Sequence, residues 1–265
     1  MRQALAVILL IGLAGFAKAE PARPTVVSLD YCADQFVLAL ADRDQILAVS
    51  KDAERQFSHL RDKAAGLPKV RAAAEDVIAL GPDVVVRSWG GDARALAFYE
   101  RFGIRTVQLG YADNIPGTED VLRAVAAEIG QGERAEALIA AMPAPTAATG
   151  RSALYVTPGG VSAGSGTMID AIMRHAGLSN ANNGTGWTGL PLERLVLAPP
   201  QLMLTAFFGF DDDATNQWSV SRHPVMQRLM ARAQVIAMDE SRVSCPAWLV
   251  ADEARDVAQA LEADR

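Results

Sequence analysis

The chain is poor in the side chains that most often bind transition metals, with two cysteines and three histidines among 265 residues. The histidines are His59, His175 and His223, and they lie far apart in the sequence. None of them has a second ligand at the spacing of a metal-binding motif. We therefore expect no site for a free metal ion.

Positive charge is also scarce, because 25 Lys and Arg residues face 31 Asp and Glu residues and give a net charge of −6. Proteins that bind nucleic acid need a basic surface to neutralise the phosphates. The balance of charge in this chain argues against a nucleic-acid partner.

Long apolar runs are absent except at the start of the chain, where residues 4–16 are apolar apart from two glycines. A membrane-spanning helix needs about 20 apolar residues. The run follows a short positive start and precedes Ala17-Lys18-Ala19, which is typical of a signal peptidase site. We predict a signal peptide over residues 1–19, cleaved before Glu20, although an uncleaved anchor is the alternative. Because no cysteine lies at the cleavage point, we expect an exported protein that is neither lipid-anchored nor inserted in the membrane.

Strands and helices alternate twice along the remaining chain. Short β-branched or apolar runs predict strands at 25–29, 45–49, 83–87, 104–109, 153–157, 202–207 and 234–238. Helical periodicity lies between them and in a last helix from about residue 247. This spacing is typical of βαβ units with parallel sheets. We predict two α/β halves, over residues 20–116 and 151–265.

Residues 117–150 connect the halves, and their apolar residues repeat with a helical period up to Met142. Gly130 and Gly132 divide the segment into two helices. Such helices would form a rigid strut between two lobes, whereas the alternative is an ordinary crossover helix within one sheet. Pro143 and Pro145 interrupt the second helix, since proline removes a helical hydrogen bond, and the stiffness of the strut stays open.

Several segments together resemble the periplasmic substrate-binding proteins of ABC importers for ferric siderophores, haem and cobalamin. They are VVSLDYCADQ near the start, AEDVIALGPDVVV at 74–86, ERAEALIA at 133–140, SAGSGTMID at 162–170 and LPLERLVLAPPQLML at 190–204. The resemblance covers nearly all of the chain after residue 19. It implies two Rossmann-like lobes with parallel sheets, joined by a single connecting helix. It also implies a periplasmic monomer that captures a ferric siderophore or a cobalamin-type ligand in the cleft between the lobes, without enzymatic turnover and without a cofactor of its own. A haem-binding protein of the same scaffold is the alternative.

Glu75 and Glu193 occupy equivalent positions, each near the start of the helix that leads to a strand in its own half. In the family that the chain resembles, this position carries the acid that docks on arginines of the permease, whose partner is the importer's ATPase. Two charges at a fixed separation would select one docking pose. The simpler alternative is that each carboxylate only stabilises the start of its helix.

Ligands of open α/β sheets bind beyond the carboxyl ends of the strands. Aromatic side chains there suit a flat macrocycle or a catecholate, and an arginine suits an anionic edge. Positions at these strand ends, and tryptophans on irregular segments that could reach the same cleft, give the ligand-binding candidates Tyr31, Trp89, Tyr111, Trp187, Phe207, Trp218, Arg242 and Trp248.

A secreted serine hydrolase is the rival from another class. Residues 160–164 match G-x-S-x-G around Ser162, and Asp211–Asp213 and His223 follow in the order of α/β-hydrolases. That motif requires a strand, one tight turn and then a helix, whereas several residues separate Ser162 from the next predicted helix. We therefore expect no catalytic residue.

Cys32 follows the first predicted strand and Cys245 the last. An oxidising compartment favours a disulfide between them. Bridged cysteines need Cα atoms within about 7 Å, which is difficult if the two lie in opposite lobes. A Cys32–Cys245 bridge and two free thiols both stay open from the sequence.

Overall fold

Valine-rich runs form the parallel sheet of the N-terminal lobe. The computed structural model describes residues 23–88, 93–208 and 220–263, so the predicted signal peptide, Trp89, Trp218 and Asp211–Asp213 lie outside the described residues. The strands are β1 Val26–Ser28, β2 Ile46–Ser50, β3 Lys69–Val70, β4 Val84–Arg87 and β5 Arg105–Gln108, in the order β3-β2-β1-β4-β5. β1 and β4 are buried along their whole length, which is expected of a parallel sheet covered on both faces.

Helices cover the two faces of this sheet. The first face carries α1 Tyr31–Leu40, α4 Ile115–Glu128 and α5 Gly132–Ala140, and the second carries α2 Ala74–Leu80 and α3 Ala93–Arg101. A short 3-10 helix, η1, spans Arg61–Ala64. Buried Asp34 on α1 ties two strands to the first face, because its carboxylate accepts hydrogen bonds from the hydroxyls of Ser28 and Ser50.

The C-terminal lobe repeats the plan with a second parallel sheet. Its strands are β6 Ser152–Val156, β8 Ser179–Asn180, β10 Leu202–Thr205 and β11 Gln234–Ala237, in the order β11-β10-β6-β8. α6 Met168–His175 and α11 Val250–Ala263 cover one face, and α7 Leu192–Leu197 and α9 Pro224–Met230 cover the other. The remaining elements are the antiparallel pair β7 Val161–Ala163 and β9 Trp187–Gly189, with η2 Val220–Arg222 and α10 Glu240–Val243.

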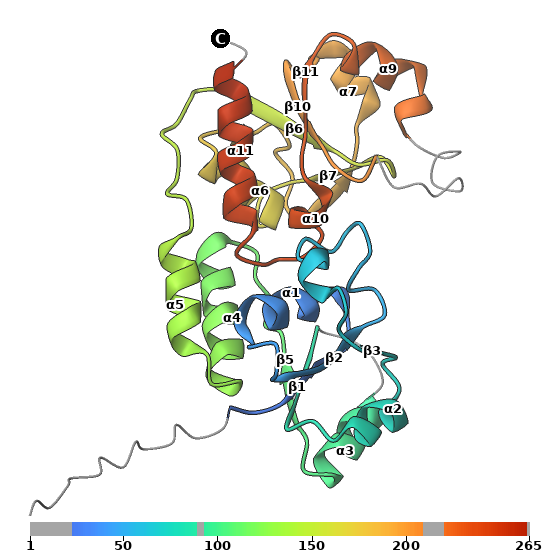
Figure 1. The fold of residues 1–265 in the computed structure, drawn as a ribbon. Coiled ribbons are helices and arrows are strands. Elements are labelled where there is room, and N and C mark those ends of the chain that lie inside the picture. Colours follow the sequence, from blue (N-terminus) through green and yellow to red (C-terminus); the bar gives the residue numbers. More distant parts are fainter. Residues whose placement is uncertain (1–22, 89–92, 209–219, 264–265) are drawn as a thin grey trace, which may run out of the picture.

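The connection between the lobes consists of two helices followed by an irregular segment, where the resemblance implies one helix. Gly130 has a φ of 72° and turns the chain between α4 and α5, which run side by side along the N-terminal lobe (Figure 1). Both helices pack into the core of that lobe, and Met142 contacts the cores of both lobes. The helical segment is therefore a layer of the N-terminal lobe rather than a free-standing strut.

The irregular segment after α5 is held against the C-terminal lobe. Thr146 N–H donates to His175 O (2.8 Å) and Thr149 N–H donates to Gly177 O (2.8 Å). Gly177 has a φ of 76°, and a Cβ there would lie 2.3 Å from Ala147 O, so only glycine allows the segment to come this close. Pro143 and Pro145 thus end the helical part, but the chain beyond them is docked on α6.

The two lobes with parallel sheets confirm the predicted fold class. The lobes stack with α11, α6, α5 and α4 on the left in Figure 1 and with α10 between the lobes. No helix within the described ranges is long and apolar enough to cross a bilayer.

Candidate functional site

The start of α1 is fixed at the carboxyl ends of two neighbouring strands. Asp30 caps the helix, since its Oδ1 accepts from Cys32 N–H (3.1 Å) and Ala33 N–H (2.9 Å). Its Oδ2 accepts from Ser88 N–H (2.7 Å), which follows β4. One side chain therefore positions Tyr31 at the edge of the sheet where a ligand of an α/β lobe is expected.

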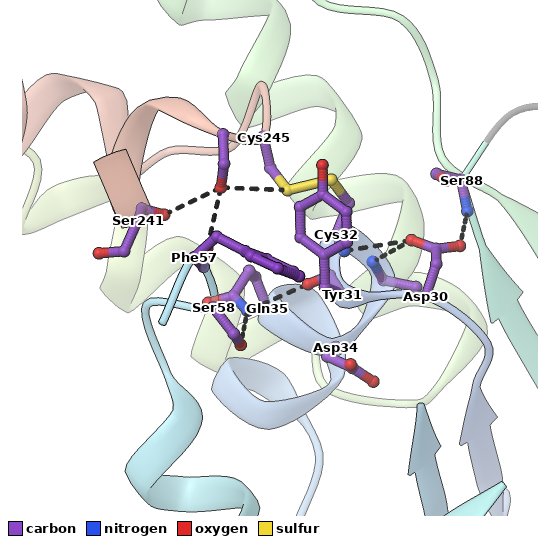
Figure 2. The surroundings of a disulfide bond; sticks show 12 residues. Asp30, Tyr31, Cys32, Asp34, Gln35, Phe57, Ser58, Ser88, Ser241 and Cys245 are labelled. Carbon is purple, nitrogen blue, oxygen red and sulfur yellow. Dashed lines mark hydrogen bonds between the residues drawn. A yellow bond between two sulfur atoms is a disulfide. The ribbon is translucent and has the colours of Figure 1, made fainter. Parts of the chain in front are cut away.

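An aromatic pair lies at this edge. The rings of Tyr31 and Phe57 are edge-to-face, with centroids 4.7 Å apart, and Figure 2 shows Tyr31 beside the disulfide with the Phe57 ring directed towards it. Burial raises the pKa of the Tyr31 hydroxyl, and the charge of Asp30 raises it further. Tyr31 therefore presents a neutral hydroxyl that can donate a hydrogen bond at neutral pH.

The loop that carries Phe57 is tied to α1 by the Gln35 amide. Gln35 Nε2 donates to Ser58 Oγ (2.7 Å), and Gln35 Oε1 accepts from Leu60 N–H (2.8 Å). The sequence analysis missed Phe57, because the loop is polar and has no periodicity. Only the two-residue spacing of Phe57 and His59 within that polar stretch could have drawn attention to it.

The C-terminal lobe reaches this loop and α1 through residues 241–249. Cys32 and Cys245 form a disulfide with a Cα–Cα distance of 5.6 Å. Ser244 Oγ donates to Phe57 O (3.0 Å), and His59 Nδ1 lies 2.9 Å from Ser241 Oγ. Of the two alternatives left open by the sequence, the structure has the bridge, and it joins the lobes beside Tyr31 (Figure 2).

The sequence predicts Trp248 as a ligand contact, but the structure buries its side chain. Its side chain is 5% exposed and packs edge-to-face on Phe36 of α1, with centroids 5.3 Å apart. Ala247, Trp248 and Leu249 belong to the core of the N-terminal lobe, although they follow the last strand of the other lobe. Because the chain crosses from the C-terminal lobe to the N-terminal lobe at these residues, cysteines from opposite halves come together. Trp248 is therefore a core residue rather than a cleft residue.

Arg242 is surrounded by acidic side chains of its own lobe. It forms an ion pair with Asp256, lies 3.7 Å from Glu253 and lies 3.6 Å from Asp239. Burial opposes its charge, but the hydrogen bond to Asp256 and the nearby acids leave its pKa raised. Its charge is thus compensated without a ligand. Burial also raises the pKa of Glu253 to about 7.

The other described candidates follow strands of both lobes. Tyr111 follows β5 and is 80% exposed. Trp187 begins β9, and its exposed ring lies edge-to-face with Tyr155 at 6.1 Å. Phe207 follows β10 with a φ of 67°, a conformation that is costly for a residue with a Cβ and concentrates at functional sites. The ring of Trp187 thus contacts Tyr155, whereas the ring of Tyr31 contacts Phe57.

A cavity of about 450 Å³ lies at the junction of the lobes, between the start of α4 and α6. Its lining includes Asn114, Pro145, Arg174 and His175, and none of the predicted ligand-binding residues. Of the irregular segment after α5, Pro145 forms part of its wall. The strand ends near Tyr31 are therefore the better candidate for the ligand site.

Glu75 and Glu193 lie as the sequence predicts, in the exposed first turns of α2 and α7. These helices are at the opposite outer ends of the two lobes, and both lie on the right in Figure 1. Neither helix lies beside α1, which carries Cys32 and Tyr31 (Figure 1).

The residues of the hydrolase alternative do not form a nucleophile elbow. Ser162 is buried on β7, and within the described chain its hydroxyl has no hydrogen-bond partner. His223 instead caps α9, where its Nδ1 accepts from Val225 N–H (3.3 Å). Within the described ranges there is also no group of three or more His, Cys, Asp or Glu side chains that could hold a metal ion.

Solved structures with the same fold cover almost the whole chain. A periplasmic haem-binding protein from Pseudomonas aeruginosa is 21% identical, with a TM-score of 0.65 over 90% of this chain and 92% of that one. The chain has the fold of periplasmic ligand-binding proteins. The haem-binding protein HutB of Vibrio cholerae (20% identity, TM-score 0.64, 91% and 99% covered) and the vitamin B12-binding protein BtuF of the same organism (17%, 0.60, 91% and 97%) also match. No protein-family model matches the chain, and no curated protein sequence matches it. The resemblance predicted from the sequence is confirmed at the level of the fold.

Proposed function

We propose that this protein is the solute-binding component of an ABC importer. It captures a small ligand between its lobes and passes it to a permease with its ATPase. The observation that carries the proposal is the Tyr31–Phe57 pair at the carboxyl end of the first sheet, at the point where the second lobe reaches across. The shared fold with haem- and B12-binding periplasmic proteins supports it.

The ligand is a metal chelate or a tetrapyrrole. A ferric siderophore or cobalamin is the first choice, because aromatic walls stack on flat or apolar ligand surfaces. Haem is the second choice, and the hydroxyl of Tyr31 at the site favours it. The raised pKa of that hydroxyl means that iron must displace its proton before it can bind the oxygen. The residues proposed to line the cleft are Tyr31, Phe57, Trp89, Tyr111, Trp187, Phe207 and Trp218.

The protein acts in the periplasm as a monomer, without turnover. The signal-peptide pattern of residues 1–19 and a disulfide, which persists in oxidising compartments, support this location. Glu75 and Glu193 orient the loaded protein on the permease. Their distance from the aromatic pair separates docking from ligand binding.

Tryptophan-fluorescence titration with haem, cyanocobalamin and a ferric hydroxamate tests the ligand class. We expect saturable quenching by one of them, with a Kd between about nanomolar and micromolar. Trp89→Ala should weaken that binding by about 1–3 kcal/mol if the ring stacks on the ligand. Phe98→Ala, on the outer helix α3, is the matched control and should bind as the wild type does.

The same titration separates the alternatives. A Soret band that changes in Tyr31→Phe identifies haem with tyrosine as an iron ligand. If none of the three compounds binds, and a chromogenic ester is hydrolysed in a manner that Ser162→Ala abolishes, the importer proposal is wrong and the hydrolase alternative is right.

A further inference from the structure

A cavity of about 710 Å³ lies in the C-terminal lobe, between α7, the antiparallel pair β7–β9 and the loop after β8. It adjoins a cavity of about 450 Å³, and the two share apolar wall residues. No described residue that was predicted to contact the ligand of the cleft lines it. We call it the α7 cavity, and the residues of its wall that matter here are Leu154, Ser162, Asn182, Thr188, Arg194 and Leu195.

The register of β7 and β9 directs two hydroxyl side chains into this cavity. Ser162 pairs with Thr188, and Ala163 pairs with Trp187. Side chains alternate between the two faces of a strand, so the first pair faces one side and the second pair faces the other. Ala163 belongs to the core under α6 and α11, and Trp187 contacts Tyr155 of the same core. The β7–β9 pair therefore separates the α7 cavity from the aromatic side chains of this lobe.

The hydroxyl of Ser162 has no internal partner. The side chain is 1% exposed, and its Oγ makes no hydrogen bond to any atom of the described residues. The neighbouring polar groups are satisfied by one another, since Thr188 Oγ1 accepts from Asn182 Nδ2 (2.8 Å) and Asn182 Oδ1 accepts from Gly184 N–H (2.9 Å). A buried hydroxyl without a partner is destabilising, and such groups are rare in folded proteins. Ser162 can therefore find a partner only in the cavity.

Arg194 on α7 places a positive charge at the opening of the cavity. Its side chain is exposed, and its guanidinium has neither an ion pair nor a hydrogen bond within the described ranges. A guanidinium is well suited to bind a carboxylate through two hydrogen bonds. The buried side chains of Leu154 and Leu195 form an apolar wall of the same cavity. From its buried side to its opening, the cavity thus offers a hydroxyl, an apolar wall and a cation.

We propose that the α7 cavity is a second binding site, which takes a small carboxylic acid with an apolar body and a hydroxyl or carbonyl oxygen at its far end. The carboxylate pairs with Arg194, the body packs on Leu154 and Leu195, and the far oxygen forms a hydrogen bond with Ser162 Oγ. A serine hydroxyl suits either kind of oxygen, because it both donates and accepts. Apolar walls with a few polar groups are typical of small-molecule sites. The site is independent of the importer function, since no described residue proposed to line the cleft lies in its wall.

Calorimetric titration with three probes tests this chemistry. para-Hydroxybenzoate carries the carboxylate and the far hydroxyl, benzoate lacks the hydroxyl, and phenol lacks the carboxylate. We expect saturable binding of para-hydroxybenzoate with a Kd below about 1 mM. Benzoate and phenol should each bind at least about five-fold more weakly, because each forgoes one of the polar contacts.

Variants assign each end of the probe to its residue. Ser162→Ala should weaken binding of para-hydroxybenzoate by about five-fold or more and change binding of benzoate by less than about two-fold. Arg194→Gln should weaken both carboxylates by a similar factor of about five or more. Arg232→Gln is the matched control, because Arg232 is also exposed in this lobe but does not line the cavity, and it should bind both probes as the wild type does.

The thermal midpoint without probe separates binding from folding. Ser162→Ala removes an unpaired buried hydroxyl, so its midpoint should equal or exceed that of the wild type. A lower midpoint would show that the hydroxyl has a structural partner, and it would overturn the proposal.

Two further results would contradict the site. One is the absence of saturable heat with para-hydroxybenzoate up to about 10 mM. The other is binding that Ser162→Ala and Arg194→Gln leave unchanged, which would place the probe elsewhere. Failure of haem, cyanocobalamin and the ferric hydroxamate to bind, with the expected pattern for para-hydroxybenzoate, would overturn the importer proposal and leave this site standing.

Discussion

Removing the Cys32–Cys245 disulfide should strongly destabilise the protein. The two cysteines are 213 residues apart and join the lobes. A cross-link over a loop of that length lowers the entropy of the unfolded chain by an amount worth about 5 kcal/mol at 25 °C. Residual structure in the unfolded chain reduces this value, so we expect Cys32→Ser with Cys245→Ser to lose about 3–5 kcal/mol of unfolding free energy.

Calorimetry with and without reductant measures this loss. For a chain of this length we expect a fall of roughly 6–20 °C in the thermal midpoint. Wild type in dithiothreitol should melt at the temperature of the double serine variant, and the variant should not respond to dithiothreitol. The hydrogen bonds from the other lobe to Phe57 and His59 should weaken with the bridge, so ligand affinity should fall as well.

Two results would refute this reasoning. Thiol titration of the denatured protein without reductant should find no reactive thiol, and two reactive thiols would show that the bridge does not form. A thermal midpoint that moves by less than about 2 °C in reductant would show that the bridge does not stabilise the protein by lowering the entropy of the unfolded chain.

Three further predictions concern other parts of the chain. Burial raises the pKa of Glu253 from 4.5 to about 7, so the unfolding free energy of the wild type should fall as the pH rises from 4.5 through 7. Urea titrations should therefore find Glu253→Gln equal to wild type at pH 4 and more stable at pH 8 by up to about 3 kcal/mol. Trp248→Ala should lower the unfolding free energy by about 3–5 kcal/mol, while the protein that stays folded should bind the ligand with the affinity of the wild type. A large change in the affinity of the folded protein would show that Trp248 contacts the ligand. Reversing Glu75 and Glu193 to lysine should abolish uptake in a transport assay while fluorescence titration finds the ligand affinity of the wild type, and normal transport by the double variant would exclude the docking role.

Local patterns in the sequence predicted the elements of both sheets. Buried strands such as β4 are continuous apolar runs, and Gly81, with a φ of 60°, ends α2 directly before Pro82. These signals depend on near neighbours in the chain. The predicted strands missed β3, β8 and the pair β7–β9. These strands have two or three residues each, and unlike β1 they do not lie in an apolar β-branched run.

Only the tertiary structure decided what lies at the candidate site. Trp248 and Cys245 follow the last strand of the C-terminal lobe, so the order of the elements placed both near its cleft. The chain instead crosses after α10, fills the core beside Phe36 and brings Cys245 to Cys32. The sequence determined that there are two parallel α/β lobes with a glutamate on equivalent outer helices. Which segments meet between the lobes was decided by packing between residues about 200 positions apart, and no local pattern carries that information.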